Sequence, residues 1–222
     1  PADAPASSPL LPLLDPEQGG VVVAGPWRGS PQEWQSHVQA LRRWQQRSGW
    51  PVLADALSGL RGLPDLQLVS AYDPLLHVPE TLPAPGQVLR LGTLPASRRL
   101  QRWLEACDGP QVLISQGDPR RLDPLGVVAD DSQWSGGLSA WVDAVLGPAA
   151  VDSDAATAPA ESRLQAQRWL TQEATAQRVL DQEIPWDGGT TASEPWLARA
   201  LSRLLPPGLP VMLASSSPVR DW

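Results

Sequence analysis

Two adjacent arginines, Arg98 and Arg99, follow Ser97 at the predicted start of a helix, and Ser97 is a suitable N-cap residue. The partial positive charge of a helix N-terminus disfavours cations, so the pair predicts a compensating anion nearby. Free backbone N–H groups and two guanidinium groups would meet at the carboxyl end of a strand predicted over 87–92, where open α/β sheets bind ligands. On residue types alone, the simpler interpretation is that both side chains lie in solvent or pair with an acidic neighbour such as Glu105.

Two further groups of polar residues are weaker candidates. Tyr72, Asp73 and His77 could form a catalytic cluster, but a histidine four residues after an aspartate is equally a local helix pair. Arg120 and Arg121 could form a second anion site after another strand. We interpret these two arginines as solvated loop residues.

The composition excludes several kinds of function. The formal net charge of -7 argues against nonspecific nucleic-acid binding, and all 17 basic residues are arginine, which excludes a P-loop or Schiff-base lysine from this chain. The single cysteine, Cys107, allows no intrachain disulfide and is expected to be a small buried side chain, while His37 and His77 lack metal-ligand spacing. No apolar run is long enough to span a membrane and no signal-peptide pattern is present, so the chain is predicted to be soluble and cytoplasmic.

Short apolar segments alternate with segments of helical periodicity. Strands are expected over 19–25, 51–55, 87–92, 111–117 and 126–130. Helices are expected over 31–48, 98–107 and 137–146, and on both sides of Pro74 between 66 and 82. The alternation predicts an α/β fold with a doubly wound parallel sheet, although no GxGxxG dinucleotide fingerprint follows any strand.

Low-complexity segments divide the chain. Residues 1–18 and 148–160 are predicted linkers, so 19–147 is expected to form a central α/β domain. Beyond them a polar helix is expected up to Glu183, then a helix over 193–208 with Ser193 as its N-cap and a strand from about residue 210. One helix and one strand cannot form a domain alone, so 161–222 is interpreted as a helical connection and the incomplete start of another domain. The chain is accordingly expected to be part of a longer protein.

Three motifs establish a family resemblance: GWPVLADALSGLR (49–61), LGTLPASRRL (91–100) and SEPW followed by LPPGLPVMLASSSPVRD (193–221). In order and separation they resemble the central part of the thiamin-diphosphate-dependent SEPHCHC synthases of menaquinone and phylloquinone biosynthesis. The resemblance runs from about residue 19 to the C-terminus. It implies a three-domain enzyme of which this chain is the transhydrogenase-like central domain, together with the first helix and strand of the diphosphate-binding domain.

The resemblance also implies a reaction and substrate-binding residues. Members of the family decarboxylate 2-oxoglutarate on thiamin diphosphate and add the resulting carbanion to isochorismate. Arg98 stands where the family usually has lysine, and Arg99 matches a basic position of some members; both would hold isochorismate carboxylates. Ser216 and Arg220 match the serine and arginine of a substrate-facing turn, in which Ser215 replaces the usual asparagine. Since planar arginine forks bind carboxylates bidentately, ligand binding becomes the preferred interpretation of Arg98 and Arg99.

The residues that activate thiamin diphosphate and hold Mg²⁺ in the family belong to the two flanking domains. The Asp-Gly-Gly at 187–189 lies in a linker and lacks the later asparagine of the magnesium motif. We therefore expect this chain alone to bind neither cofactor and to be inactive, and the full-length enzyme to be a homo-oligomer. The alternatives are a noncatalytic module that senses an acidic metabolite, for example through Arg90, Arg120 and Arg121, and a structural spacer.

Overall fold

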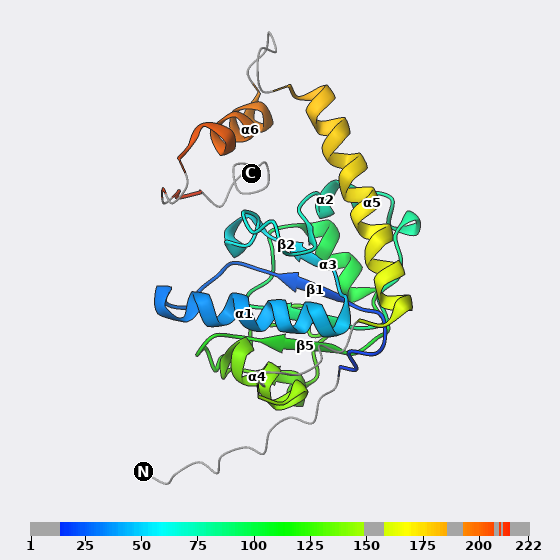
Figure 1. Cartoon of the computed structure of the whole chain (residues 1–222), viewed down its shortest axis with the longest axis vertical. Helices are drawn as coiled ribbons and strands as arrows, with labels where there is room; N and C mark the ends of the chain where they lie inside the picture. Colours follow the sequence, from blue (N-terminus) through cyan, green and yellow to red (C-terminus); the bar gives the residue numbers. More distant parts are fainter. Residues whose placement is uncertain (1–13, 149–157, 186–192, 207–208, 210, 214–222) are drawn as a thin grey trace.

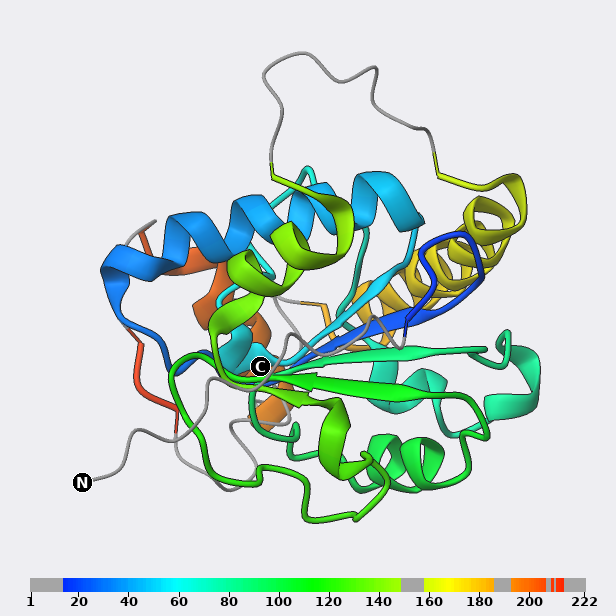
Figure 2. The ribbon, with the colours of Figure 1, turned by 90° about the horizontal axis from the view of Figure 1, so that it is seen from below.

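The computed structural model describes residues 14–148, 158–185, 193–206, 209 and 211–213, and its centre is a parallel sheet with helices on both faces (Figures 1 and 2). All neighbouring strands pair in parallel, in the order β3-β2-β1-β4-β5-β6. The strands are β1 Val21–Ala24, β2 Val52–Ala54, β3 Leu68–Val69, β4 Val88–Leu91, β5 Gln111–Ile114 and β6 Gln133–Trp134. The predicted doubly wound α/β fold is confirmed.

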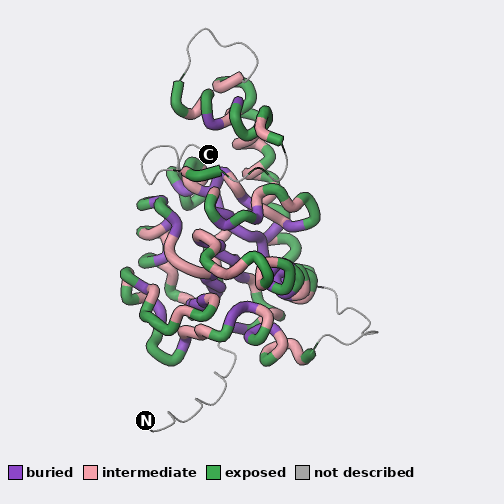
Figure 3. The backbone as a smooth tube through the Cα atoms, turned by 90° about the vertical axis from the view of Figure 1, so that its left-hand side faces the viewer, coloured by how far each residue is buried: buried purple, intermediate pink, exposed green. Residues whose placement is uncertain are grey.

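The strands are short and apolar because both of their faces are covered. Along β1, Val22 and Ala24 enter one core, whereas Val21 and Val23 enter the core on the opposite face. This alternation follows the two-residue repeat of a strand, and burial on both faces is typical of parallel sheets. Every residue of β1, β2, β4 and β5 is buried, and Figure 3 shows how buried and exposed residues are distributed along the backbone.

Two helices cover one face of the sheet, α1 (Pro31–Ser48) and α4 (Gly137–Leu146), and Figure 2 shows them side by side. Three indoles fill this layer: Trp44 lies 4.9 Å from Trp141 and 5.2 Å from Trp50 between ring centroids. The helix α1 ends at Gly49, whose φ of 72° places it in the left-handed region that glycine adopts without strain, and the N–H of Gly49 donates to Gln45.

The opposite face is covered by α2 (Tyr72–Leu75), α3 (Arg98–Glu105) and the long helix α5 (Ala160–Glu183). Leu100, Leu104 and Trp169 bury their side chains there against the sheet. The last helix, α6 (Glu194–Leu204), buries only Ala198 and Ala200 and is otherwise largely exposed (Figure 3). Short 3-10 turns occupy Ala56–Ser58, Pro79–Thr81 and Asp130–Ser132.

Several predicted elements differ from the structure. Residues 126–130 form no strand, because the Val128 N–H donates to the side chain of Asp123 at 2.8 Å and is unavailable to a neighbouring strand. The sixth strand lies later, at Gln133–Trp134. Between 66 and 82 the predicted helix was wrong in its first half, where Leu68–Val69 pairs with β2, and only Tyr72–Leu75 is α-helical.

The first predicted linker and the predicted C-terminal elements also differ from the structure. Residues 14–18, inside the first predicted linker, are anchored to the sheet: Leu14 is buried and the Asp15 N–H donates to Gln87 at 2.7 Å. The helix α6 begins after the predicted N-cap Ser193, whose hydroxyl accepts from the Trp196 N–H, but ends at Leu204. Residues 211–213 form no strand; the remainder of the strand predicted from 210 lies outside the described residues.

One buried ion pair fastens the connection between β5 and β6, which crosses the sheet without a covering α-helix. Arg90 projects from the middle of β4 and donates to Asp123 at 2.7 Å, and the two side chains are 2% and 1% exposed. Asp123 also accepts from the Val128 backbone. A buried charge without a partner is strongly unfavourable. Removing either Arg90 or Asp123 would therefore leave the other as an unpaired buried charge.

We predict that Asp123→Ala lowers the free energy of unfolding by about 3–5 kcal/mol, because it leaves the Arg90 guanidinium buried without its carboxylate. Urea denaturation of the wild-type chain and the variant measures this loss. Asp65→Ala is the matched control: the side chains of Asp65 and its partner Arg42 are 49% and 42% exposed, so their ion pair should contribute little to stability. Equal losses in the two variants would contradict this prediction.

His37 is a buried histidine on α1. It is 8% exposed, and its ring lies 4.4 Å from that of Trp27 and 5.9 Å from that of Trp34. The Nδ1 atom of His37 is buried and has no hydrogen-bond partner among the described residues. Burial disfavours the charged imidazolium and lowers the pKa of His37 to about 4 from the ordinary 6.5.

The free energy of unfolding should therefore fall as the pH drops from about 6.5 to about 4. Over this interval the unfolded chain binds the His37 proton and the folded chain does not, so stability rises with pH, by about 1.4 kcal/mol per unit. Urea denaturation at several pH values measures the slope. His37→Asn should flatten the slope, whereas the same substitution at the exposed His77 should leave it intact. A slope unchanged in His37→Asn would refute the assignment.

Candidate functional site

The N-terminus of α3 lies at the carboxyl edge of the sheet, directly after β4. Ser97 is the N-cap, as predicted: its hydroxyl oxygen accepts from the Leu100 N–H at 3.0 Å. The same hydroxyl donates to the carboxylate of Asp73, which belongs to α2. The start of α3 is thus tied to a helix that precedes it by more than twenty residues.

Arg99 has an internal anionic partner. Its Nη1 donates to the second oxygen of Asp73 at 2.5 Å, and the two side chains are 46% and 41% exposed. The compensating anion that the sequence predicts for the arginine pair is therefore, in the case of Arg99, the carboxylate of Asp73. Glu105, the acidic neighbour considered from the sequence, forms no ion pair with Arg99 in the described part of the chain.

Arg98 is exposed beside this pair. Within the described ranges its side chain forms no hydrogen bond or ion pair. Its guanidinium group can therefore meet an external carboxylate without giving up a partner among those residues. The two neighbouring arginines consequently have different environments, and only Arg99 is held in place.

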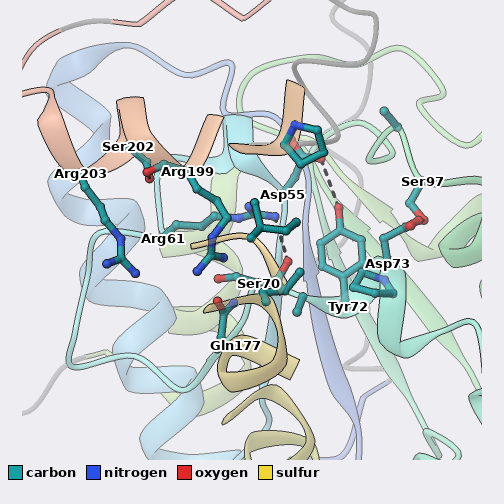
Figure 4. A pocket seen from close by; sticks show the side chains of 16 residues that line it. Asp55, Arg61, Ser70, Tyr72, Asp73, Ser97, Gln177, Arg199, Ser202 and Arg203 are labelled. Carbon is teal, nitrogen blue, oxygen red and sulfur yellow. Dashed lines mark hydrogen bonds between the residues drawn. The ribbon is translucent and has the colours of Figure 1, made fainter. Parts of the chain in front are cut away.

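A cavity of about 490 Å³ opens next to the α3 N-terminus (Figure 4). Asp73 and Ser97 line one side of it, and the side chains of Arg98 and Arg99 do not line it. Its other walls come from the carboxyl ends of β2 and β3, from the end of α5 and from α6, with three arginines among their residues: Arg61, Arg199 and Arg203. The lining therefore combines these arginines with the carboxylates of Asp55 and Asp73.

The floor of the cavity is a buried hydrogen-bond network. The Asp55 carboxylate accepts from the Leu57 N–H at 2.8 Å and from the Tyr72 hydroxyl at 3.3 Å. Burial, with the nearby Asp55 charge, raises the pKa of Tyr72, so its hydroxyl remains protonated as a donor. Arg61 donates to the carbonyls of Ala54 at 2.9 Å and Ser70 at 3.1 Å, which ties together the ends of β2 and β3.

The outer wall of the cavity is closed by ion pairs between two helices. Arg199 and Arg203 of α6 both donate to one oxygen of Asp181 on α5, the latter at 2.9 Å. These ion pairs join α5 to α6. The exposed positions of Arg203 and Asp181, 45% and 53%, limit the energy of their pair.

The structure brings together only part of the predicted site. Ser216 and Arg220 lie outside the described residues. Of the weak cluster at 72–77, Tyr72 and Asp73 reach the cavity, whereas His77 is exposed and does not line it. Sequence reasoning missed Arg61, although its position shortly after a predicted strand is the signal that could have found it. No comparable sequence pattern points to Arg199 or Arg203.

The arginines proposed for a metabolite-sensing pocket are paired internally. Arg90 is buried against Asp123, Arg120 pairs with Asp118 at 2.6 Å, and Arg121 pairs with Asp130. The side chains of Arg120 and Arg121 are largely exposed, at 79% and 49%, as expected for loop residues. Cys107 is only half-buried, at the edge of the core under α3.

The described residues assign no position to a metal or to thiamin diphosphate. They contain no group of three histidine, cysteine, aspartate or glutamate side chains placed to hold a metal ion. The carboxylates of Asp55 and Asp73, which line the cavity, already accept from protein donors. In this part of the chain there is also no helix with the length and apolarity required to cross a membrane.

Comparison with known proteins shows to which family the chain belongs. Residues 16–209 match the family described as the middle domain of thiamine pyrophosphate enzymes. The chain is 50% identical to the 2-succinyl-5-enolpyruvyl-6-hydroxy-3-cyclohexene-1-carboxylate (SEPHCHC) synthase of Synechococcus sp. strain RCC307, with 100% of this chain and 38% of that protein covered. Similar relatives carry the same name: the protein of Synechococcus sp. strain CC9311 is 48% identical (98% and 37% covered), and that of Prochlorococcus marinus strain MIT 9313 is 46% identical (94% and 35% covered).

The resemblance established from the three motifs is thereby confirmed, and the chain spans less than two fifths of the curated relatives it matches, 38% in the first case. The six-stranded parallel sheet agrees with a middle domain of this kind. The chain belongs to the family of middle domains of thiamine pyrophosphate enzymes.

Proposed function

We propose that this chain is the central part of a SEPHCHC synthase, a transferase that decarboxylates 2-oxoglutarate and adds the remaining four-carbon unit to isochorismate. The observation that carries the proposal is 50% identity to a synthase over the whole chain. The arginine pair at the carboxyl edge of the sheet supports it, because both substrates are dicarboxylic acids. Thiamin diphosphate, when bound by the complete enzyme with Mg²⁺, would supply the chemistry of decarboxylation.

The residues of this chain would bind and orient the acceptor substrate. Arg98, exposed and without a partner among the described residues, would bind one carboxylate of isochorismate, and Arg99 would add a second donor group. Ser216 and Arg220 are part of the same proposal through the family turn that they match. Arginine in place of the usual lysine at position 98 offers a planar fork, which fixes the orientation of a carboxylate more strictly than a single ammonium group.

The alternative of a metabolite-sensing module receives less support. Its three candidate arginines each have an aspartate partner, and Arg90 would have to expose a buried ion pair to bind a ligand. A purely structural spacer would not need an arginine pair at a helix N-terminus, where cations are electrostatically unfavourable. A cytoplasmic, homo-oligomeric enzyme acting in menaquinone or phylloquinone biosynthesis completes the proposal.

In the complete synthase, we predict that Arg98→Ala or Arg99→Ala raises the apparent KM for isochorismate about tenfold or more, since each removes charge-assisted hydrogen bonds to a carboxylate. Steady-state kinetics with each substrate varied separately measure the effect, and the KM for 2-oxoglutarate should change little. Arg102→Ala, an exposed position one turn further along α3, is the matched control. An unchanged KM for isochorismate in both variants would reject the substrate-binding role.

We further predict that thiamin diphosphate with Mg²⁺ produces no saturable heat when titrated into this chain. The complete synthase should give a saturable binding isotherm under the same conditions, because the proposal assigns the cofactor residues to the flanking domains. Isothermal titration calorimetry of both proteins makes the comparison. Binding by the short chain would show that the central sheet itself holds a cofactor site.

A further inference from the structure

One carboxylate organises the start of α3. The two oxygens of Asp73 are used by different donors: one accepts from the Ser97 hydroxyl and the other from Nη1 of Arg99 at 2.5 Å. Asp73 lies on α2, 24 residues before Ser97 and 26 before Arg99. A contact between separate elements therefore determines the position of a side chain in the first turn of α3.

The contact leaves most of the Arg99 guanidinium available. Only Nη1 is used, and neither Nε nor Nη2 donates a hydrogen bond to a described residue. The Arg99 side chain is 46% exposed, so an incoming carboxylate can reach the remaining N–H groups. A guanidinium has five N–H donors in a fixed plane, and an arginine held at one of them loses less conformational freedom when a ligand binds.

Asp73 is itself held rigidly. Its neighbour Tyr72 is 4% exposed and donates to the buried Asp55, and Pro74 follows it within the same helical turn. Proline restricts the backbone at this point, and the buried tyrosine anchors it to the floor of the cavity. A binding arginine oriented by a rigid second residue is the arrangement that precise ligand recognition requires.

We propose that Asp73 is a positioning residue for carboxylate recognition: it holds the Arg99 guanidinium so that its unused N–H groups face the substrate beside Arg98. The inference rests on the proposed function and deepens it. Asp73 does more than stabilise the helix start, because Ser97 caps the Leu100 N–H directly and the contact with Arg99 is separate from that cap. The ion pair also offsets the unfavourable position of a cation at the N-terminus of α3.

The test is Asp73→Asn in the complete synthase. The asparagine oxygen can still accept from Ser97, but the charge that holds Arg99 is lost. We expect the KM for isochorismate to rise about threefold, the size of effect typical of a half-exposed ion pair. The kcat and the KM for 2-oxoglutarate should stay within about twofold of wild type, and Asp65→Asn, which removes the charge from another exposed aspartate–arginine pair, should change none of the three.

A double-mutant cycle with Arg99→Ala makes the test specific. If Asp73 acts through Arg99, Asp73→Asn has no further effect on the KM for isochorismate once Arg99 is alanine. An effect that persists in the Arg99→Ala background, or an unchanged KM in Asp73→Asn while Arg99→Ala raises it, overturns the proposal. Asp73→Glu keeps the charge but displaces it; it provides the same cycle if the asparagine variant does not fold.

The outcomes also separate this inference from the proposed function. If neither Arg98→Ala nor Arg99→Ala changes the KM for isochorismate, the substrate-binding role itself fails. If Arg98→Ala alone raises it, that role is retained for Arg98 and the positioning role of Asp73 is rejected. If all three variants raise it and the cycle shows coupling between Asp73 and Arg99, both proposals are supported.

Discussion

Parallel pairing places the carboxyl ends of all six strands on one edge of the sheet, and the candidate site depends on that constraint. The strands are covered on both faces, so the interior accepts few polar side chains. Polar groups collect instead where the strands end: Asp55 follows β2, Tyr72 lies after β3 and Ser97 comes after β4. These residues are distant in sequence, yet they line one cavity because the topology brings their strands to the same edge.

The chain contains arginine but no lysine, and aspartate is the usual partner of arginine in the structure. The environments of these pairs differ greatly. Arg90 and Asp123 are almost fully buried and replace apolar packing under a connection that has no α-helix, whereas Arg99 and Asp73 are half-exposed at the site. The first pair can contribute to stability only while both members remain, whereas the second contributes less to stability and leaves N–H groups of Arg99 open to a ligand.

The roles proposed for the central and flanking domains are consistent with these environments. The central domain would supply cationic groups for substrate carboxylates, and the flanking domains would supply the cofactor. In such an arrangement the reaction requires domains to be placed correctly relative to one another. The ion pairs of Asp181 with Arg199 and Arg203 join α5 to α6, the helix predicted from the sequence to begin the next domain.

The fold class, four of the six strands and the N-caps of α3 and α6 could be predicted from the residues alone. These features depend on local patterns: apolar runs typical of a sheet covered on both faces, helical periodicity, and a serine directly before α3 and before α6. The sequence also led to the family, through motifs that stand in a fixed order. It could not find β3 and β6, because strands of two residues carry almost no pattern and exist only through their pairing with β2 and β5.

The arrangement of the candidate site depends on contacts between elements that are distant in sequence. The apolar residues before Asp130 resemble a strand, yet the backbone N–H of Val128 is taken by Asp123, whose position is set by Arg90 on a separate strand. Adjacent residues Arg98 and Arg99 are the same residue type and both are exposed, but only Arg99 is held by Asp73 from another helix. Long-range contacts of this kind depend on where the chain brings its elements together, and the local sequence around either partner does not encode that position.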